Sequence, residues 1–225
     1  MSTREFKLDH FLIYGLENQQ LVKESVTLEG QFDEKEPVKA MLTRLVKFAN
    51  PVMKDRCDIL NKNAHMTGYS LYQRVSEPKR FVKLDNQFGK GQEIIISDAV
   101  AMWAPARKYE SGIGFPEKFD HYKVYQIVDM KPIQKEVQLK DQFDSRKAKV
   151  IIPVAFAVPV EKVHEGKTYS IYNKDTHLTI YAISPSKDIP KVIKARDQFD
   201  SYLLRIGRSH RLAVPSHKIE WKVID

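Results

Sequence analysis

Four stretches of the chain open with a short run of apolar, β-branched and aromatic residues, a composition that is typical of β-strands. These runs cover residues 11–14, 67–71, 123–127 and 178–183. A turn that contains Lys, Asn, Ser or Pro follows, and then a second run in which apolar and polar residues alternate, as in Val137-Gln138-Leu139. Such alternation places the apolar side chains on one face of a strand. The pattern predicts an all-β protein.

One segment fits a different period. Between residues 36 and 48 the apolar residues fall at helical spacing, and local periodicity alone would predict a helix. These residues are Val38, Met41, Leu42, Leu45 and Val46. The corresponding segment of the next stretch, Glu93-Ile94-Ile95-Ile96, has the composition of a strand. Because copies of one unit should pack alike, we predict a strand in both.

The four stretches are copies of a tandem repeat, which must be identified before any shorter motif is weighed. Each copy has a His and, four residues later, a Tyr, and successive His positions lie 55, 56 and 56 residues apart. The pairs are His10 and Tyr14, His65 and Tyr69, His121 and Tyr125, and His177 and Tyr181. A turn follows, at Gln31-Phe32-Asp33, Gln87-Phe88-Gly89, Gln142-Phe143-Asp144 and Gln198-Phe199-Asp200. Each copy ends in Pro-x-x-Lys, at Pro51 and Lys54, Pro105 and Lys108, Pro159 and Lys162, and Pro215 and Lys218.

Copies one and three resemble each other, as do copies two and four, which indicates that a two-repeat unit was duplicated. The connector 109–116 contains two Gly and one Pro and is the best domain boundary. We therefore predict two similar antiparallel β-barrel or β-sandwich domains, 1–110 with repeats 10–54 and 65–108, and 117–225 with repeats 121–162 and 177–218. Within a repeat we expect further strands, such as 149–154 and 155–158, and a final strand at 219–224.

Bulk composition limits the function classes. The 225 residues are 42% hydrophobic and 29% charged, as in ordinary folded domains. No apolar run reaches the roughly 20 residues of a membrane helix, and the first residues lack the apolar segment of a signal peptide. One cysteine, Cys57, cannot form an intramolecular disulfide. These features favour a cytoplasmic or virion-like location.

The formal net charge of +8 is unevenly distributed. Residues 1–112 contain 17 Lys or Arg and 15 Asp or Glu, whereas the remainder contains 20 and 14. The second half is therefore the more basic, which is compatible with binding to polyanions.

The His-x-x-x-Tyr, Gln-Phe-Gly/Asp and Val-Pro-x-x-Lys motifs together resemble an uncharacterised bacterial and archaeal repeat domain of unknown function, over nearly the whole chain. That domain occurs mostly in secreted or surface proteins, so the resemblance implies such a location. Relatives tend to have Cys directly before the Tyr and two residues before the Pro. This chain has neither.

If the two cysteines pair in the relatives, these positions must be neighbours in the fold. The resemblance then implies four contacting pairs, Ile13/Ala49, Gly68/Trp103, Val124/Ala157 and Ile180/Ala213. In the second pair one residue is the smallest and the other the largest, which conserves the volume of a packed core.

The recurring polar residues invite catalytic and structural interpretations. Four copies of one active site are unusual, and no nucleophile or base partner lies near any motif His, so we expect the His and Tyr residues to be structural. Metal ligation by His-x-x-x-Tyr is the alternative, but the usual ligand clusters are absent. The Lys of each Pro-x-x-Lys is expected to cover an aromatic ring with its stem. No Gly-rich phosphate loop or other cofactor motif is present, so no cofactor and no catalytic residue is predicted.

The strongest candidate for ligand binding is the basic segment of the fourth repeat, which departs from its sister copies. It comprises Arg205, Arg208, His210 and Arg211 in an expected hairpin turn, with Lys187, Lys191, Lys194 and Arg196 upstream. Arg side chains there could bind phosphate or carboxylate groups. A solvated turn is the alternative.

Three hypotheses follow. The first is a non-catalytic module for structure, assembly or binding, with a homo-oligomer or another protein as partner. The second is a polyanion-binding module for nucleic acid or acidic glycan. The third is a hydrolase with a site near Tyr109–Tyr122. Fold analogy alone does not decide among them.

Overall fold

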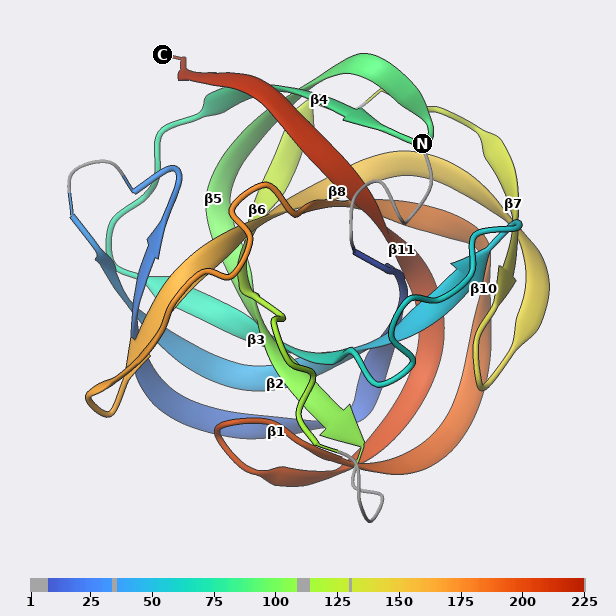
Figure 1. Ribbon diagram of the computed structural model, residues 1–225, viewed down its shortest axis with the longest axis horizontal. Coiled ribbons are helices and arrows are strands. Elements are labelled where there is room, and N and C mark those ends of the chain that lie inside the picture. Colours follow the sequence, from blue (N-terminus) through green and yellow to red (C-terminus); the bar gives the residue numbers. More distant parts are fainter. Residues whose placement is uncertain (1–7, 34–35, 109–113, 130, 225) are drawn as a thin grey trace.

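The structure is a computed structural model that describes residues 8–33, 36–108, 114–129 and 131–224. Its elements are all β-strands (Figure 1): β1 (His10–Gly30), β2 (Val38–Lys54), β3 (His65–Gln73), β4 (Arg80–Asn86), β5 (Gly89–Lys108), β6 (His121–Asp129), β7 (Lys135–Lys140), β8 (Ser145–His164), β9 (Lys167–Tyr169), β10 (His177–Arg196) and β11 (Ser201–Val223). The predicted all-β, antiparallel class is confirmed.

The strands that open and close each repeat form a ring (Figure 1). β1 pairs with β2, β2 with β3, β3 with β5, and β5 with β6. The series continues from β6 to β8, β10 and β11, and β11 returns to β1. All of these pairings are antiparallel, so each ring segment has a hydrogen-bonded neighbour on both sides. Additional strands extend the ring into one eleven-stranded sheet.

A hairpin closed by the Gln-Phe turn forms the distal part of each repeat. In the fourth repeat, for example, residues 191–196 of β10 pair with 201–206 of β11. Hydrogen bonds close the turns, from the Asp33 amide to the Gly30 carbonyl and from the Asp197 amide to the Asp200 carbonyl, both at 3.1 Å. The predicted role of these residues as turns is therefore correct.

Several predicted boundaries change. The segment with helical spacing lies in β2, so the strand prediction holds there. The two strands predicted at 149–154 and 155–158 are one continuous strand, β8. The predicted final strand is the end of β11, and β1 and β10 run through the turns that we expected within repeats one and four.

The two halves of the chain share the sheet. β1 of the first half pairs with β11 and β8 of the second, and β4 pairs with β11. The connector between the halves thus separates two pairs of repeats whose strands belong to one sheet, a point that the sequence left open when it predicted two similar halves. Its residues 109–113 lie outside the described part of the chain. The reason is physical: a ring of eight strand segments leaves no unpaired edge, whereas each half alone would leave two.

Apolar side chains on one face of the ring form an inner core that includes the four predicted pairs. Ile13 lies opposite Ala49, Gly68 opposite Trp103, Val124 opposite Ala157 and Ile180 opposite Ala213. The volume exchange is also as predicted, because a Cβ atom on Gly68 would lie 3.2 Å from two atoms of the Trp103 ring. The opposite face of the ring contributes to a second, larger core beneath the hairpins.

Candidate functional site

The motif residues meet one another between repeats. The Phe of each turn packs edge-on against the motif Tyr of the repeat two positions away. The pairs are Tyr14–Phe143, Tyr69–Phe199, Tyr125–Phe32 and Tyr181–Phe88, with ring centroids 5.1–5.7 Å apart. Aromatic pairs favour this edge-to-face geometry. We call each such contact, with the groups around it, a turn clamp.

The motif Lys of the preceding repeat completes each clamp. Its ammonium lies over the turn Phe at 4.4–5.4 Å from the ring centroid, in the pairs Lys54–Phe88, Lys108–Phe143, Lys162–Phe199 and Lys218–Phe32. The expected aromatic partner is present, but the ammonium and not the stem lies over the ring, in the geometry of a cation–π contact. Lys54, Lys108 and Lys162 are also buried. Because Lys218 belongs to the last repeat and Phe32 to the first, the series of contacts closes on itself.

A polar residue just before the turn Gln holds the Tyr hydroxyl in three clamps. The Tyr14 hydroxyl donates to Asp141 at 2.7 Å, the Tyr69 hydroxyl donates to Asp197, and Asn86 donates to the Tyr181 hydroxyl at 2.7 Å. Burial raises the pKa of Asp197 and of these tyrosines. Gly30 stands at this position in the first repeat, so its clamp must be built differently.

A buried charge network replaces that residue around Tyr125. The Lys123 ammonium, which is fully buried, lies 2.8 Å from Asp33 Oδ1 and 2.8 Å from Glu77 Oε1. Arg80 pairs with the other oxygen of Glu77 at 2.9 Å and donates to the Phe32 carbonyl. Burial raises the pKa of Asp33, and the nearby Lys123 opposes that rise. Two cations and two anions therefore neutralise one another inside the protein.

The four motif His residues are buried, and burial lowers the pKa of each to about 3. They are therefore neutral at pH 7. His177 Nδ1 lies 3.2 Å from the Asp175 carbonyl, as expected for a His bonded to backbone, whereas His121 bonds the side chain of Gln198 at 3.0 Å. His65 stacks on Phe48. Their surroundings fit a structural role.

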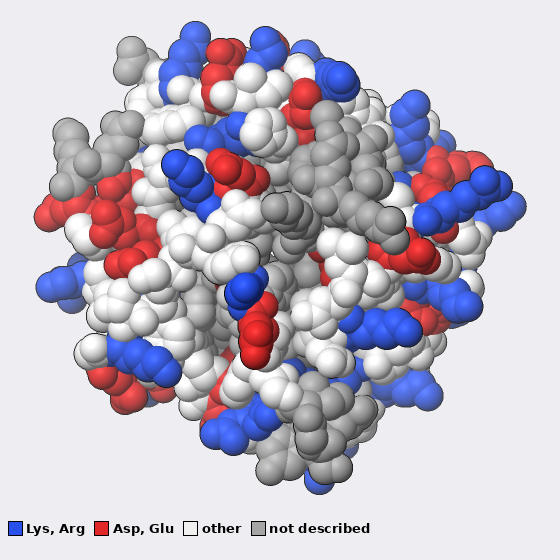
Figure 2. Space-filling view, in the orientation of Figure 1, with Lys and Arg blue, Asp and Glu red and all other residues white. Residues whose placement is uncertain are grey.

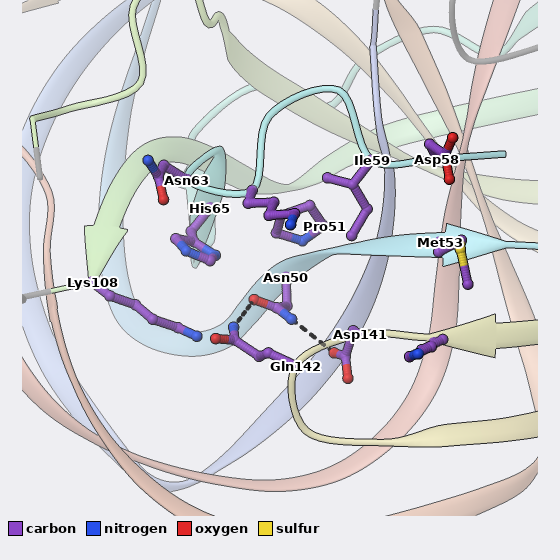
Figure 3. Close-up of a pocket in the computed structure, with 12 residues that line it drawn as sticks. Asn50, Pro51, Met53, Asp58, Ile59, Asn63, His65, Lys108, Asp141 and Gln142 are labelled. Carbon is purple, nitrogen blue, oxygen red and sulfur yellow. Dashed lines mark hydrogen bonds between the residues drawn. The ribbon is translucent and has the colours of Figure 1, made fainter.

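A cavity of about 680 Å³ lies beside the third-repeat turn (Figure 3). The end of β2, the linker after it, His65, Lys108 and the turn at Asp141 and Gln142 surround it. Figure 3 shows Asn50 in the wall, between Gln142, which donates to its carbonyl oxygen, and Asp141, to which it donates at 2.8 Å. The other repeats have Ala104, Val158 and Val214 at the position of Asn50. Sequence reasoning missed this signal, a polar residue at an apolar repeat position.

The cavity offers polar groups of both signs but no arrangement for nucleophilic attack. The lining includes Lys62, Lys108 and Lys140 together with Asp58 and Asp141, and its described residues contain no Ser, Thr or Cys. Burial, with a further effect of Lys108, lowers the pKa of His65 to about 3, which makes it a weak base. Within residues 8–33, 36–108, 114–129 and 131–224, no three His, Cys, Asp or Glu lie where they could hold a metal ion. In the same ranges no helix is long and apolar enough to span a bilayer.

The predicted basic turn does not exist as a turn. Residues 205–211 lie inside β11, and the hairpin of the fourth repeat turns earlier, at 197–200. Arg208 pairs with Asp188 at 3.1 Å, and Arg205 opposes Val192 on the exposed face of the hairpin. His210 and Arg211 lie near Lys47 of the first repeat. The predicted residues therefore lie in two places, with Arg205 on the exposed face of the hairpin and His210 and Arg211 near Lys47. Figure 2 shows Lys and Arg interspersed with Asp and Glu on the face that it presents.

The site proposed for a hydrolase, near Tyr109–Tyr122, falls partly on residues 109–113, outside the described ranges. Of its described part, Tyr122 is fully buried in the inner core, and burial raises the pKa of its hydroxyl. Its hydroxyl donates to Thr176 at 3.4 Å, which is a structural contact.

Comparison with known proteins identifies a family. No curated protein and no solved structure matches the chain. A family model described as a repeat of unknown function (DUF7450) matches residues 65–215, from the His of the second repeat to the Pro of the fourth. The match covers well over half of the chain and agrees with the repeat found in the sequence. The chain therefore belongs to the family described as a repeat of unknown function, DUF7450.

Proposed function

We propose that the protein is a non-catalytic β-repeat module that serves structure, assembly or binding. The observation that supports this most is the turn clamp: the Phe of every turn contacts the motif Tyr of one other repeat and the motif Lys of another. Residues that recur in all four repeats are thus engaged in joining repeats. A ring joined in this way is a rigid scaffold on which non-repeated residues can form interaction surfaces.

Size-exclusion chromatography with light scattering, with electron micrographs of the same sample, tests the assembly role. Discrete oligomers or tubes are the expected result. A monomer of 26.1 kDa at all concentrations would contradict self-assembly. In that case affinity capture with the purified ring would test the binding role that remains.

A second candidate function is polyanion binding, for nucleic acid or acidic glycan, through the fourth hairpin. Lys194 opposes Leu203 and Arg205 opposes Val192, and all four side chains are exposed. Alternation along the strands places Arg196 on this same face. Three cations on one exposed strand face could contact successive backbone charges of a polyanion, which would make the affinity depend on salt.

The test is salt-dependent binding of heparin and of single-stranded DNA. The triple variant Lys194→Ala/Arg196→Ala/Arg205→Ala should abolish binding that falls steeply with salt. The matched control is Lys135→Ala/Lys147→Ala/Lys149→Ala, which removes equal charge from the equivalent hairpin, where Lys149 opposes Glu136. Equal loss in both variants would show a non-specific charge effect and contradict this function.

A further inference from the structure

One position in the ring carries a β-bulge in every repeat. The pairing skips one residue, five before the motif Pro, and the skipped residues are Val46, Val100, Val154 and His210. The next residue is Ala101 or Ala155 in the middle repeats, but Lys47 in the first and Arg211 in the fourth. Bulges redirect side chains and often lie beside functional sites. The first and fourth repeats therefore replace apolar residues by cations at a redirected position.

These cations come together because the first and fourth repeats are neighbours in the ring. β1 lies between β2 and β11, with Gly15 opposite Lys47 and Ile13 opposite Arg211. Lys47 Nζ is 3.5 Å from His210 Nε2. A Cβ atom on Gly15 would lie 3.7 Å from Lys47 Nζ and 3.9 Å from His210 Cε1, so the missing side chain leaves open space over Gly15, beside the two groups.

This basic group lacks an acidic partner in the part of the chain that the structure describes. Among the described residues, none of Lys47, His210 and Arg211 forms an ion pair with an acid. Glu17, the nearest acid along β1, lies against Gly207 instead. Burial lowers the pKa of all three groups, and the neighbouring cations lower those of Lys47 and His210 further. Three half-buried cationic or protonatable groups that repel one another are stabilised by an anion.

We propose that Lys47, His210 and Arg211 form a binding site for a single oxyanion, a phosphate or carboxylate group, above Gly15. The Arg guanidinium can bind two oxygens in parallel and the Lys ammonium a third. His210 Nδ1 lies 3.3 Å from the Arg208 carbonyl, which fixes the ring and directs Nε2 toward Lys47. This site goes beyond the proposed scaffold role and uses residues separate from the exposed face of Lys194, Arg196 and Arg205.

Isothermal titration calorimetry of the full chain with inorganic phosphate, and separately with acetate, tests the site. Saturable one-to-one binding of at least one of the two anions is expected. The anion that binds shows whether the site takes a phosphate or a carboxylate group. Arg211→Ala and His210→Val restore the residues of the third repeat, so they should fold. Each should weaken binding at least tenfold, as should Lys47→Ala.

The matched control is Lys39→Ala, which removes an exposed cation from the same strand as Lys47 and should leave binding unchanged. The imidazole signals of His210 in NMR spectra give a second readout: bound anion should raise the pKa of His210. The proposal is overturned if neither anion binds saturably, or if Lys39→Ala weakens binding as much as Arg211→Ala. A monomeric protein would leave this result intact, so failure of the assembly role and failure of the site are distinguishable.

Discussion

The clamps at Tyr125 and Tyr181 share the same edge-on aromatic contact but differ in the polar groups around it, which are charged at Tyr125 and neutral at the Tyr181 hydroxyl. At Tyr181 the groups that surround the hydroxyl are neutral: Asn86 donates to it, and Thr179 shares a hydrogen bond of 2.7 Å with Ser216. At Tyr125 the position of Thr179 is occupied by Lys123, which is paired with Asp33 and Glu77. The turn Phe nevertheless packs edge-on at 5.2 Å in one clamp and 5.1 Å in the other.

The difference teaches that the aromatic contact is what the repeat retains, whereas the polar groups around it can be exchanged as a set. Gly30 removes the side chain that holds the hydroxyl in the other clamps, and a closed network of four charges occupies the region instead. A buried charge is tolerated only with its partners, so these residues must change together.

The largest expected effect on the free energy of unfolding comes from the four motif His residues, which are buried and neutral in all four repeats. A His with an unfolded pKa of about 6.5 and a folded pKa of about 3 contributes stability that is fully present above pH 6.5 and is lost as the pH falls. At pH 5 each should have lost about 2 kcal/mol, roughly 8 kcal/mol for four. Urea unfolding at pH 7.5 and pH 5 measures this.

One control variant refines the acid experiment, and two buried carboxyl groups act against the expected loss. His177→Gln should reduce the pH-dependent loss by about 2 kcal/mol, whatever it does to stability at pH 7.5. Asp33 and Asp197 act in the opposite direction, because a raised folded pKa gives stability that is present below pH 3.8 and lost as the pH rises. Equal free energies of unfolding at pH 7.5 and pH 5 would contradict the buried neutral state.

Lys123→Met tests the difference between the two clamps through the free energy of unfolding. It leaves Asp33 and Glu77 buried without their ammonium partner, which should lower the free energy of unfolding by about 3–5 kcal/mol. Thr179→Val, at the same repeat position in the neutral clamp, removes one hydrogen bond and should cost about 1 kcal/mol. Urea denaturation of both variants measures the difference, and similar losses would show that the network is not a special feature of the first clamp.

The loss of a Tyr hydroxyl is expected to have a smaller effect than the loss of Lys123. Tyr14→Phe removes a hydrogen bond to the Asp141 carboxylate and should cost about 1.5–3 kcal/mol, whereas Tyr181→Phe removes a neutral bond with Asn86 and should cost about 0.5–1.5 kcal/mol. Thermal and urea unfolding would rank the two variants. The reverse order would contradict the assignment of Asn86 as the donor to a neutral group.

Whether a contact could be predicted from the sequence depends on how far apart its two residues lie along the chain. The four neighbour pairs, including Gly68 and Trp103, were predicted from the cysteine positions of the family that the repeat resembles, and each pair lies within one repeat, on adjoining strands. The clamps were not, since nothing near Phe32 in the sequence indicates that its partner Tyr125 lies two repeats away. The ring closure between β1 and β11 escaped prediction for the same reason.

The candidate sites show a similar limit. Arg211 and His210 were noticed because they break the repeat, but Lys47 was not linked to them, because their contact depends on the closure between the first and fourth repeats. The predicted turn at 205–211 was wrong because a strand continues through a bulge, which a sequence pattern does not distinguish from a turn. Asn50 could have been found by comparing repeat positions.

The most direct test of the central claim, that motif residues join distant repeats, is a double-mutant cycle. Tyr125→Ala and Phe32→Ala, alone and combined, should show a coupling of about 0.5–3 kcal/mol in urea unfolding, because their rings touch. The cycle of Tyr125→Ala with Phe88→Ala, whose ring packs on Tyr181, should be additive within about 0.5 kcal/mol. Additivity in the first cycle, or equal coupling in both, would contradict the clamp.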